Sequence, residues 1–152
     1  MKSGHFRPMK NRQTKPVLTA VISGCTFYGN SSGIGCSGCS PILENTIIAF
    51  STEGGSVTCT GSPSSPALTC CDVYGNAGGD WVGCIADQFA VNGNISEDPL
   101  FCDAENGDLH LDCSSPCVYG YGCGQMGACG IGCGGPSRIQ PATWGSIKAI
   151  YR

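Results

Sequence analysis

The chain has 152 residues, of which 24 are glycine, 9 are proline and only 12% are charged, a composition that argues against a helical bundle. All eight Lys and Arg lie outside residues 16–137, and all eleven acidic residues lie inside that range. This distribution disfavours binding to nucleic acid, because phosphate contacts need basic side chains. No run approaches the ~18 apolar residues of a transmembrane helix.

Cysteine usage indicates the compartment. Thirteen cysteines in a chain of this length are typical of an oxidising environment. We therefore expect a secreted or cell-surface protein. Because the number is odd, at least one thiol is free or bonded outside the chain.

The first 16 residues are basic, polar and without periodicity. They predict a disordered or vector-like arm. An alternative is a short signal segment, since Val17–Ile22 is followed by Ser23-Gly24-Cys25, which is similar to a bacterial lipoprotein cleavage box. The apolar run is shorter than such signals need, and it also fills the first repeat described next.

From residue 22 the sequence repeats itself. Segments 22–30, 43–51 and 68–76 align without gaps, with starts 21 and 25 residues apart. The first position is always aliphatic, the sixth is always apolar, and the ninth is a turn former: Ile22, Leu43 and Leu68; Phe27, Ile48 and Val73; Asn30, Ser51 and Asn76.

Self-similarity at this period predicts a solenoid, because a unit of short strands buries its apolar side only by stacking on the next unit. Positions one and six would face opposite ways on a straight strand. Both are apolar, so we expect a bend between them, near Gly24, Asn45 and Cys70. A β-sandwich of unrelated hairpins is the alternative, but it does not explain why the aliphatic, apolar and turn-forming positions recur in a fixed order.

These repeats resemble those of bacterial secreted right-handed parallel β-helix proteins. The stretch Asp98–Cys117 is similar to the closing coil of that group, and Gly124-Gln-Met-Gly-Ala128 to its final turn. The resemblance implies an all-β fold: a short right-handed parallel β-helix of three to four coils over residues 17–135, with a cysteine-rich C-terminal cap. It also implies further coils before these, so we expect the C-terminal portion of a longer protein.

The same group includes lyases and hydrolases of polysaccharides. The resemblance implies acidic calcium ligands and a basic proton acceptor for its lyases, yet no Lys or Arg lies between residues 16 and 137. Its glycosidases use clustered aspartates, and glycoside hydrolysis needs two carboxylates at a set separation. The candidate catalytic residues are Asp72, Asp80 and Asp87.

Binding chemistry has two candidates. Tyr28, Tyr74 and Trp81 predict an aromatic face for sugar rings, with packing under a loop as the alternative. Asp103, Glu105 and Asp108 surround a glycine and superficially resemble a calcium loop, although the terminal Glu of an EF-hand is missing. A tight turn explains the same acidic residues, and no other cofactor is expected.

The cysteines fall into two groups. Cys36, Cys59 and Cys84 occupy one column of the repeat, where side chains in register point in parallel, so we expect packed thiols among them. A second group lies in glycine-rich sequence with little core, and there we expect disulfides: Cys113, Cys117, Cys123, Cys129 and Cys133.

Residues 136–152 leave the repeat and predict a linker and C-terminal tail. For the whole chain we expect a non-catalytic extracellular structural or binding module, with a polysaccharide or cell-surface glycan as its partner. The alternative is a fragment of a polysaccharide lyase or glycoside hydrolase. We also expect self-association through an open edge of the solenoid.

Overall fold

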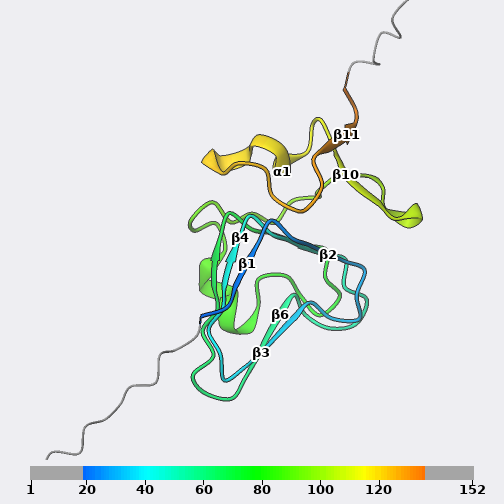
Figure 1. Cartoon of the computed structure of the whole chain (residues 1–152). Helices are drawn as coiled ribbons and strands as arrows, with labels where there is room; N and C mark the ends of the chain where they lie inside the picture. The colour runs from blue at the N-terminus through cyan, green and yellow to red at the C-terminus, as the bar shows by residue number, and fades with distance from the viewer. Residues whose placement is uncertain (1–18, 136–152) are drawn as a thin grey trace, which may run out of the picture.

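The computed structural model of the chain describes residues 19–135 (Figure 1). The expected N-terminal arm at 1–16 and the expected linker and tail at 136–152 lie outside the described residues. Short strands dominate the described part and its helices are few, so the predicted β-rich class is confirmed. Within residues 19–135, every helix is too short or too polar to span a membrane.

Eight short strands form three small parallel sheets, with strand orders β1–β4–β7, β2–β5–β8 and β3–β6. Ile22 pairs with Leu43, and Leu43 pairs with Leu68, which confirms the gapless alignment of the three segments. We call residues 19–41, 42–66 and 67–95 the first, second and third repeat. The strands are β1 (Val21–Ser23), β2 (Thr26–Tyr28), β3 (Ile34–Ser37), β4 (Ile42–Glu44), β5 (Ile47–Ala49), β6 (Val57–Thr60), β7 (Ala67–Thr69) and β8 (Asp72–Tyr74).

Left-handed residues turn the chain between the strands. The predicted bend positions Gly24, Asn45 and Cys70 have φ of +60°, +49° and +54°, so the bend is confirmed in all three repeats. The next turn uses the eighth position of each segment instead of the expected ninth. The asparagine at the ninth position has another role, since Asn76 Oδ1 accepts a hydrogen bond from the backbone N–H of Ser51 in the repeat before it. The left-handed residues of this second turn are Gly29, Phe50 and Gly75.

The inner core lies between the three sheets. Side chains at the first and sixth positions of the segments pack against one another there, as the repeat pattern predicts. Burial of each such side chain contributes about 1.5–3 kcal/mol. The most deeply buried members are Leu43, Ile48, Leu68, Val73 and Ile85.

The third repeat has a covered outer edge. After β8 the chain forms the 3₁₀ helix η1 (Gly83–Gln88) and returns beside β7 and β8. Gln88 Oε1 accepts from the N–H of Leu68, and Asn94 Oδ1 accepts from the N–H of Cys71. Side-chain amides therefore satisfy backbone groups that a further strand would otherwise pair.

The C-terminal unit, residues 97–135, does not continue the parallel stack. β9 runs antiparallel to β10, while β11 runs parallel to it. The expected closing coil at Asp98–Cys117 is therefore corrected: Gly107, with φ of +84°, helps to reverse the chain between β9 and β10. The elements are β9 (Phe101–Asp103), η2 (Ala104–Asn106), β10 (Asp108–Asp112), α1 (Pro116–Tyr119), η3 (Gly120–Gly122) and β11 (Ile131–Cys133).

This unit covers the outward face of the β2–β5–β8 sheet. In Figure 1, α1, β10 and β11 lie together on one side of the parallel strands. Ile47 and Ala49 of β5 pack there against Leu111, Val118 and Met126, which form a second core separate from the inner one. The cysteine-rich segment thus lies on a sheet face.

Candidate functional site

Asp72 is buried between β8 and α1. Its Oδ1 accepts from the N–H of Glu97 at 3.1 Å, and the Cys117 thiol donates to its Oδ2 at 3.2 Å. The pKa of Asp72 is raised to about 7, chiefly by burial and to a smaller extent by the nearby Glu97 and Asp80 carboxylates, while its hydrogen bonds from the Glu97 N–H and the Cys117 thiol oppose the rise. This carboxyl group is fully covered, which is unsuitable for contact with a polysaccharide.

The other two catalytic candidates have different surroundings. The Asp80 carboxylate accepts from the N–H groups of Gly75 and Asn76 and from the Asn76 side chain, so it orders the loop after β8. Asp87 is exposed on η1. The three aspartates thus have different surroundings: Asp72 is buried, Asp80 is hydrogen-bonded within a loop, and Asp87 is exposed.

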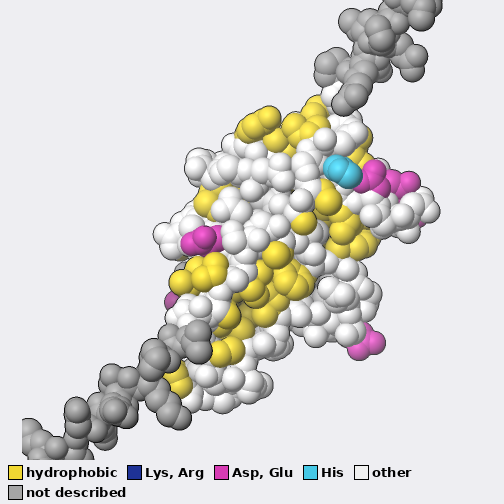
Figure 2. Space-filling view, viewed as in Figure 1, with side chains coloured by type: hydrophobic (Ala, Val, Ile, Leu, Met, Phe, Trp, Pro, Cys, Tyr) yellow, Lys and Arg dark blue, Asp and Glu magenta, His cyan; other side chains and the backbone are white. Residues whose placement is uncertain are grey.

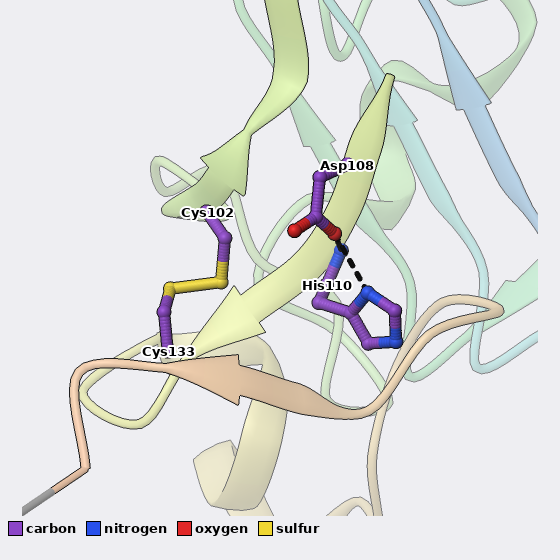
Figure 3. A network of polar contacts seen from close by, with 4 residues as sticks. All are labelled: Cys102, Asp108, His110 and Cys133. Carbon is purple, nitrogen blue, oxygen red and sulfur yellow. Dashed lines mark hydrogen bonds and ion pairs between the residues drawn. A yellow bond between two sulfur atoms is a disulfide. The ribbon is translucent and has the colours of Figure 1, made fainter. Parts of the chain in front are cut away.

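Two carboxylates of the acidic turn between β9 and β10 have partners within the turn and the adjoining strand. Asp103 accepts from the Asn106 side-chain amide, and Asp108 contacts His110 Nδ1 at 2.6 Å (Figure 3). The N–H and ring of His110 lower the pKa of Asp108. Glu105 is exposed, and the described residues contain no group of three or more His, Cys, Asp or Glu placed to hold a metal ion. The turn interpretation explains these residues.

Two of the three predicted aromatic residues belong to one cluster. Phe50 lies edge-on to both Tyr28 and Tyr74, with ring centroids 5.7 and 5.6 Å apart. Trp81 is separate: its ring packs against Phe89 and its Nε1–H donates to the carbonyl of Ile95. Sequence reasoning missed Phe50, because its position in the repeat otherwise holds glycine.

Tyr28 also borders an open hollow of about 260 Å³, which we call the aromatic hollow. Phe101 of the C-terminal unit packs edge-on to Tyr28 at 5.5 Å, so residues far apart in the sequence form its wall. One Asp98 oxygen accepts from the N–H of Leu100. The lining residues are Tyr28, Phe50, Asp98, Leu100, Phe101 and Ala104.

The disulfides differ from the expected pattern. Cys59 is bonded to Cys84, so these two members of the repeat column are not packed thiols, whereas Cys36 is a buried free thiol as expected. The S–S bond forms because Cys84 lies on η1 and not in a third in-register strand. In the C-terminal group, Cys123 and Cys133 form disulfides with Cys70 and Cys102, while Cys113, Cys117 and Cys129 are free.

Among residues 19–135, the first repeat presents an open edge. β1, β2 and β3 are each the edge strand of their sheet, and Val21 is 60% exposed. In the view of Figure 2, hydrophobic side chains gather over the space enclosed by these strands. Residues of the first repeat are only half-buried where their register partners in the second repeat are 0–3% exposed: Ile22 against Leu43, Phe27 against Ile48, and Ile34 against Val57.

The chain has no match among known proteins: no family model, no curated protein and no solved structure is similar to it. The open edge, the aromatic hollow and the cysteines are the features of the molecule that point to a function.

Proposed function

We propose that this chain is a non-catalytic, extracellular structural module. Its repeats are the coils of a right-handed parallel β-helix, and its open edge pairs with the open edge of a second copy. The observation that carries this proposal is the half-exposed first repeat, whose register partners one repeat further on are buried. The three disulfides are consistent with an extracellular protein.

Backbone chemistry favours such pairing. An edge strand has N–H and C=O groups that its own sheet leaves unpaired, and proteins usually protect such edges with charge, proline or a covering segment. Three edge strands, one from each parallel sheet, surround the apolar side chains of the first repeat here. A second set of strands would satisfy the hydrogen bonds and also bury Ile22, Phe27 and Ile34.

The charge distribution favours a second copy as the occupant. Residues 19–41 carry no charged side chain, whereas every acidic residue lies at Glu44 or beyond. Two acidic copies would thus approach through their uncharged surfaces, where like-charge repulsion is weakest. Both copies present the same three edge strands, and a two-fold symmetric interface requires the same surface on each copy.

Sedimentation velocity of the full chain over a concentration series tests this pairing. We expect a concentration-dependent dimer that Val21→Lys abolishes, because a charge on an edge strand opposes pairing. Ala67→Lys is the matched control, since Ala67 is exposed in the same column at the opposite end of the sheet and should leave the dimer intact. A monomer at every concentration, or equal loss in both variants, would contradict the proposal.

The aromatic hollow favours a second function, binding of a glycan. Sugar rings stack on aromatic faces, and a carboxylate with a free oxygen accepts from their hydroxyl groups. Tyr28, Phe50 and Phe101 supply the aromatic wall and Asp98 supplies the carboxylate. At about 260 Å³ the hollow is smaller than the ~300–1,000 Å³ of ordinary ligand sites, so it suits one ring of a chain.

A glycan array followed by calorimetry tests the second function. We expect Tyr28→Ala to weaken binding about tenfold or more, while Tyr119→Ala, which removes an aromatic ring that is 80% exposed elsewhere, leaves it unchanged. Binding that survives Tyr28→Ala, or no binding to any glycan, would exclude the aromatic hollow as a sugar site. Neither result affects the dimer proposal.

A further inference from the structure

The turn after β3 holds two thiols that form no disulfide in the structure. They stand in the order Cys36-Ser37-Gly38-Cys39. Cys36 is buried, with 1% of its surface exposed, whereas Cys39 is exposed. Gly38, with φ of +60°, turns the chain between the two cysteines, and the pKa of the Cys36 thiol is raised chiefly by burial and also by the nearby Cys39 thiol.

The aligned turn of the second repeat has no such pair. Cys59 stands in register with Cys36, but the position that corresponds to Cys39 holds Ser62. Cys59 forms its disulfide with Cys84 of η1 instead. The repeat therefore does not need a cysteine at this place in the turn, and the second thiol of the first repeat calls for a chemical explanation.

We propose that Cys36 and Cys39 form a thiol–disulfide exchange site for small disulfides, with Cys39 as the attacking thiol and Cys36 as the resolving thiol. The inference is independent of the dimer and glycan proposals. Exchange begins when a thiolate reaches a disulfide in solution. Cys39 is exposed and can do so, whereas Cys36 is covered and burial raises its pKa. The spacing of two residues is that of redox-active Cys-x-x-Cys pairs.

The reaction balances in two steps. The Cys39 thiolate attacks one sulfur of the external disulfide, forms a mixed disulfide and releases the first small thiolate. The Cys36 thiol then loses its proton and attacks Cys39 Sγ, which forms the Cys36–Cys39 disulfide and releases the second small thiolate. The protein loses two electrons and two protons, and the external disulfide is reduced to two thiols.

The adjacent Cys59–Cys84 disulfide offers a competing path. Cys36 lies one strand away from Cys59, at a spacing of ~4.8 Å that a disulfide can bridge. Attack by Cys36 on Cys59 would leave Cys84 as a free thiol. The exposure of Cys39 favours the path through Cys39, and mapping of the products separates the two.

The experiment treats the full native chain with oxidised glutathione, blocks the remaining thiols with iodoacetamide and maps the peptides by mass spectrometry. We expect Cys36 and Cys39 to lose their iodoacetamide reactivity together, joined to each other and without bound glutathione. Cys113 is the internal control: it is an exposed free thiol outside any Cys-x-x-Cys pair, and it should retain its glutathione.

Two variants assign the order of attack. Cys36→Ser should convert the transient mixed disulfide at Cys39 into the dominant species, and Cys39→Ser should leave Cys36 unmodified under native conditions. A stable glutathione adduct at Cys39 in the unsubstituted chain would overturn the proposal. So would a Cys36–Cys59 bond with Cys84 freed. Because these readings come from the unsubstituted chain, they stand even where a variant folds poorly.

Discussion

The first and second repeats share one strand pattern but differ in what covers them. Leu43, Ile48 and Val57 of the second repeat lie between two neighbours and are almost fully buried, whereas the same columns of the first repeat have a neighbour on one side only. A repeat therefore acquires its stability from both adjacent repeats and not from its own sequence. The open edge is the consequence.

The cysteines follow the same division. All six disulfide-bonded cysteines lie in the second repeat, the third repeat or the C-terminal unit. In the first repeat, by contrast, Cys25, Cys36 and Cys39 are free thiols. The covered end is therefore cross-linked by disulfides, whereas the open end is held by noncovalent contacts. Substitutions at the two ends should differ accordingly.

The largest effect should come from the disulfide between the bend of the third repeat and the C-terminal unit. Cys70 and Cys123 are 53 residues apart, so their bond lowers the entropy of the unfolded chain by an amount worth about 4 kcal/mol. The double variant Cys70→Ala/Cys123→Ala should lose about that much free energy of unfolding in urea titrations. Cys25→Ala, in the first repeat, should lose less than about 1 kcal/mol. Similar losses in both would refute the division into a cross-linked end and a free end.

The next largest effect should be a difference in stability between equivalent substitutions in the first and second repeats at one register position. Leu43→Ala removes a side chain that is 0% exposed and should cost about 3 kcal/mol of unfolding free energy. Ile22→Ala, at the register partner, should cost about 1 kcal/mol because the open edge leaves little cavity. Measured in dilute solution, equal costs would show that the first repeat is covered.

The contact between the two repeats can be tested at a pair of glycines. A Cβ on Gly33 would overlap the backbone carbonyl of Ser56 in the second repeat, whereas a Cβ on Gly35 would meet only Thr58 Oγ1 at 3.9 Å. Gly33→Ala should therefore lower the unfolding free energy by about 2–3 kcal/mol, and Gly35→Ala should leave it within about 0.5 kcal/mol. Thermal denaturation of both variants checks the difference, and a harmless Gly33→Ala would disprove the close approach.

A pH-dependent change in stability should come from Asp72 at the covered end. Its pKa rises from 3.8 to about 7 on folding, so the folded state holds the proton more tightly. Stability from this group is fully present below pH ~4 and is lost as the pH rises through about 7. Each unit by which folding raises this pKa corresponds to ~1.4 kcal/mol of stability.

Asp72→Asn tests this pH dependence. The variant should remove that part of the decline between pH 4 and 7, because its amide oxygen still accepts from the N–H of Glu97 and carries no charge. Urea titrations of both chains at several pH values give the comparison. An Asp72→Asn chain with the same slope as the unsubstituted one would assign the decline to other carboxylates.

The periodicity of the sequence predicts the strand register and the first bend, because Ile22, Leu43 and Leu68 can bury their side chains only in one alignment. It did not predict the C-terminal unit, where the antiparallel β9–β10 pair lies outside the repeat. The second core, between this unit and the β2–β5–β8 sheet, depends on contacts between distant segments that carry no local pattern.

The site residues were harder to predict. Tyr28 and Tyr74 share a repeat position, whereas Phe50 stands where the other repeats have glycine and Phe101 lies outside the repeats, so no pattern predicts that they complete the cluster. Disulfide partners such as Cys70 and Cys102 cannot be paired from spacing, since connectivity depends on the folded arrangement. Burial of Asp72 likewise follows from contacts with Glu97 and with Cys117 of α1, which are distant in the sequence.

The most direct test of the open edge is hydrogen–deuterium exchange of the full chain at low and high concentration. We expect the amides of β1–β3 to exchange much faster than those of β4–β6 in dilute solution, and to become protected as the concentration rises. The amides of β4–β6 should stay protected throughout. Equal protection of both repeats in dilute solution would contradict an open edge. An exchange rate of the β1–β3 amides that does not change with concentration would contradict pairing of that edge with a second copy.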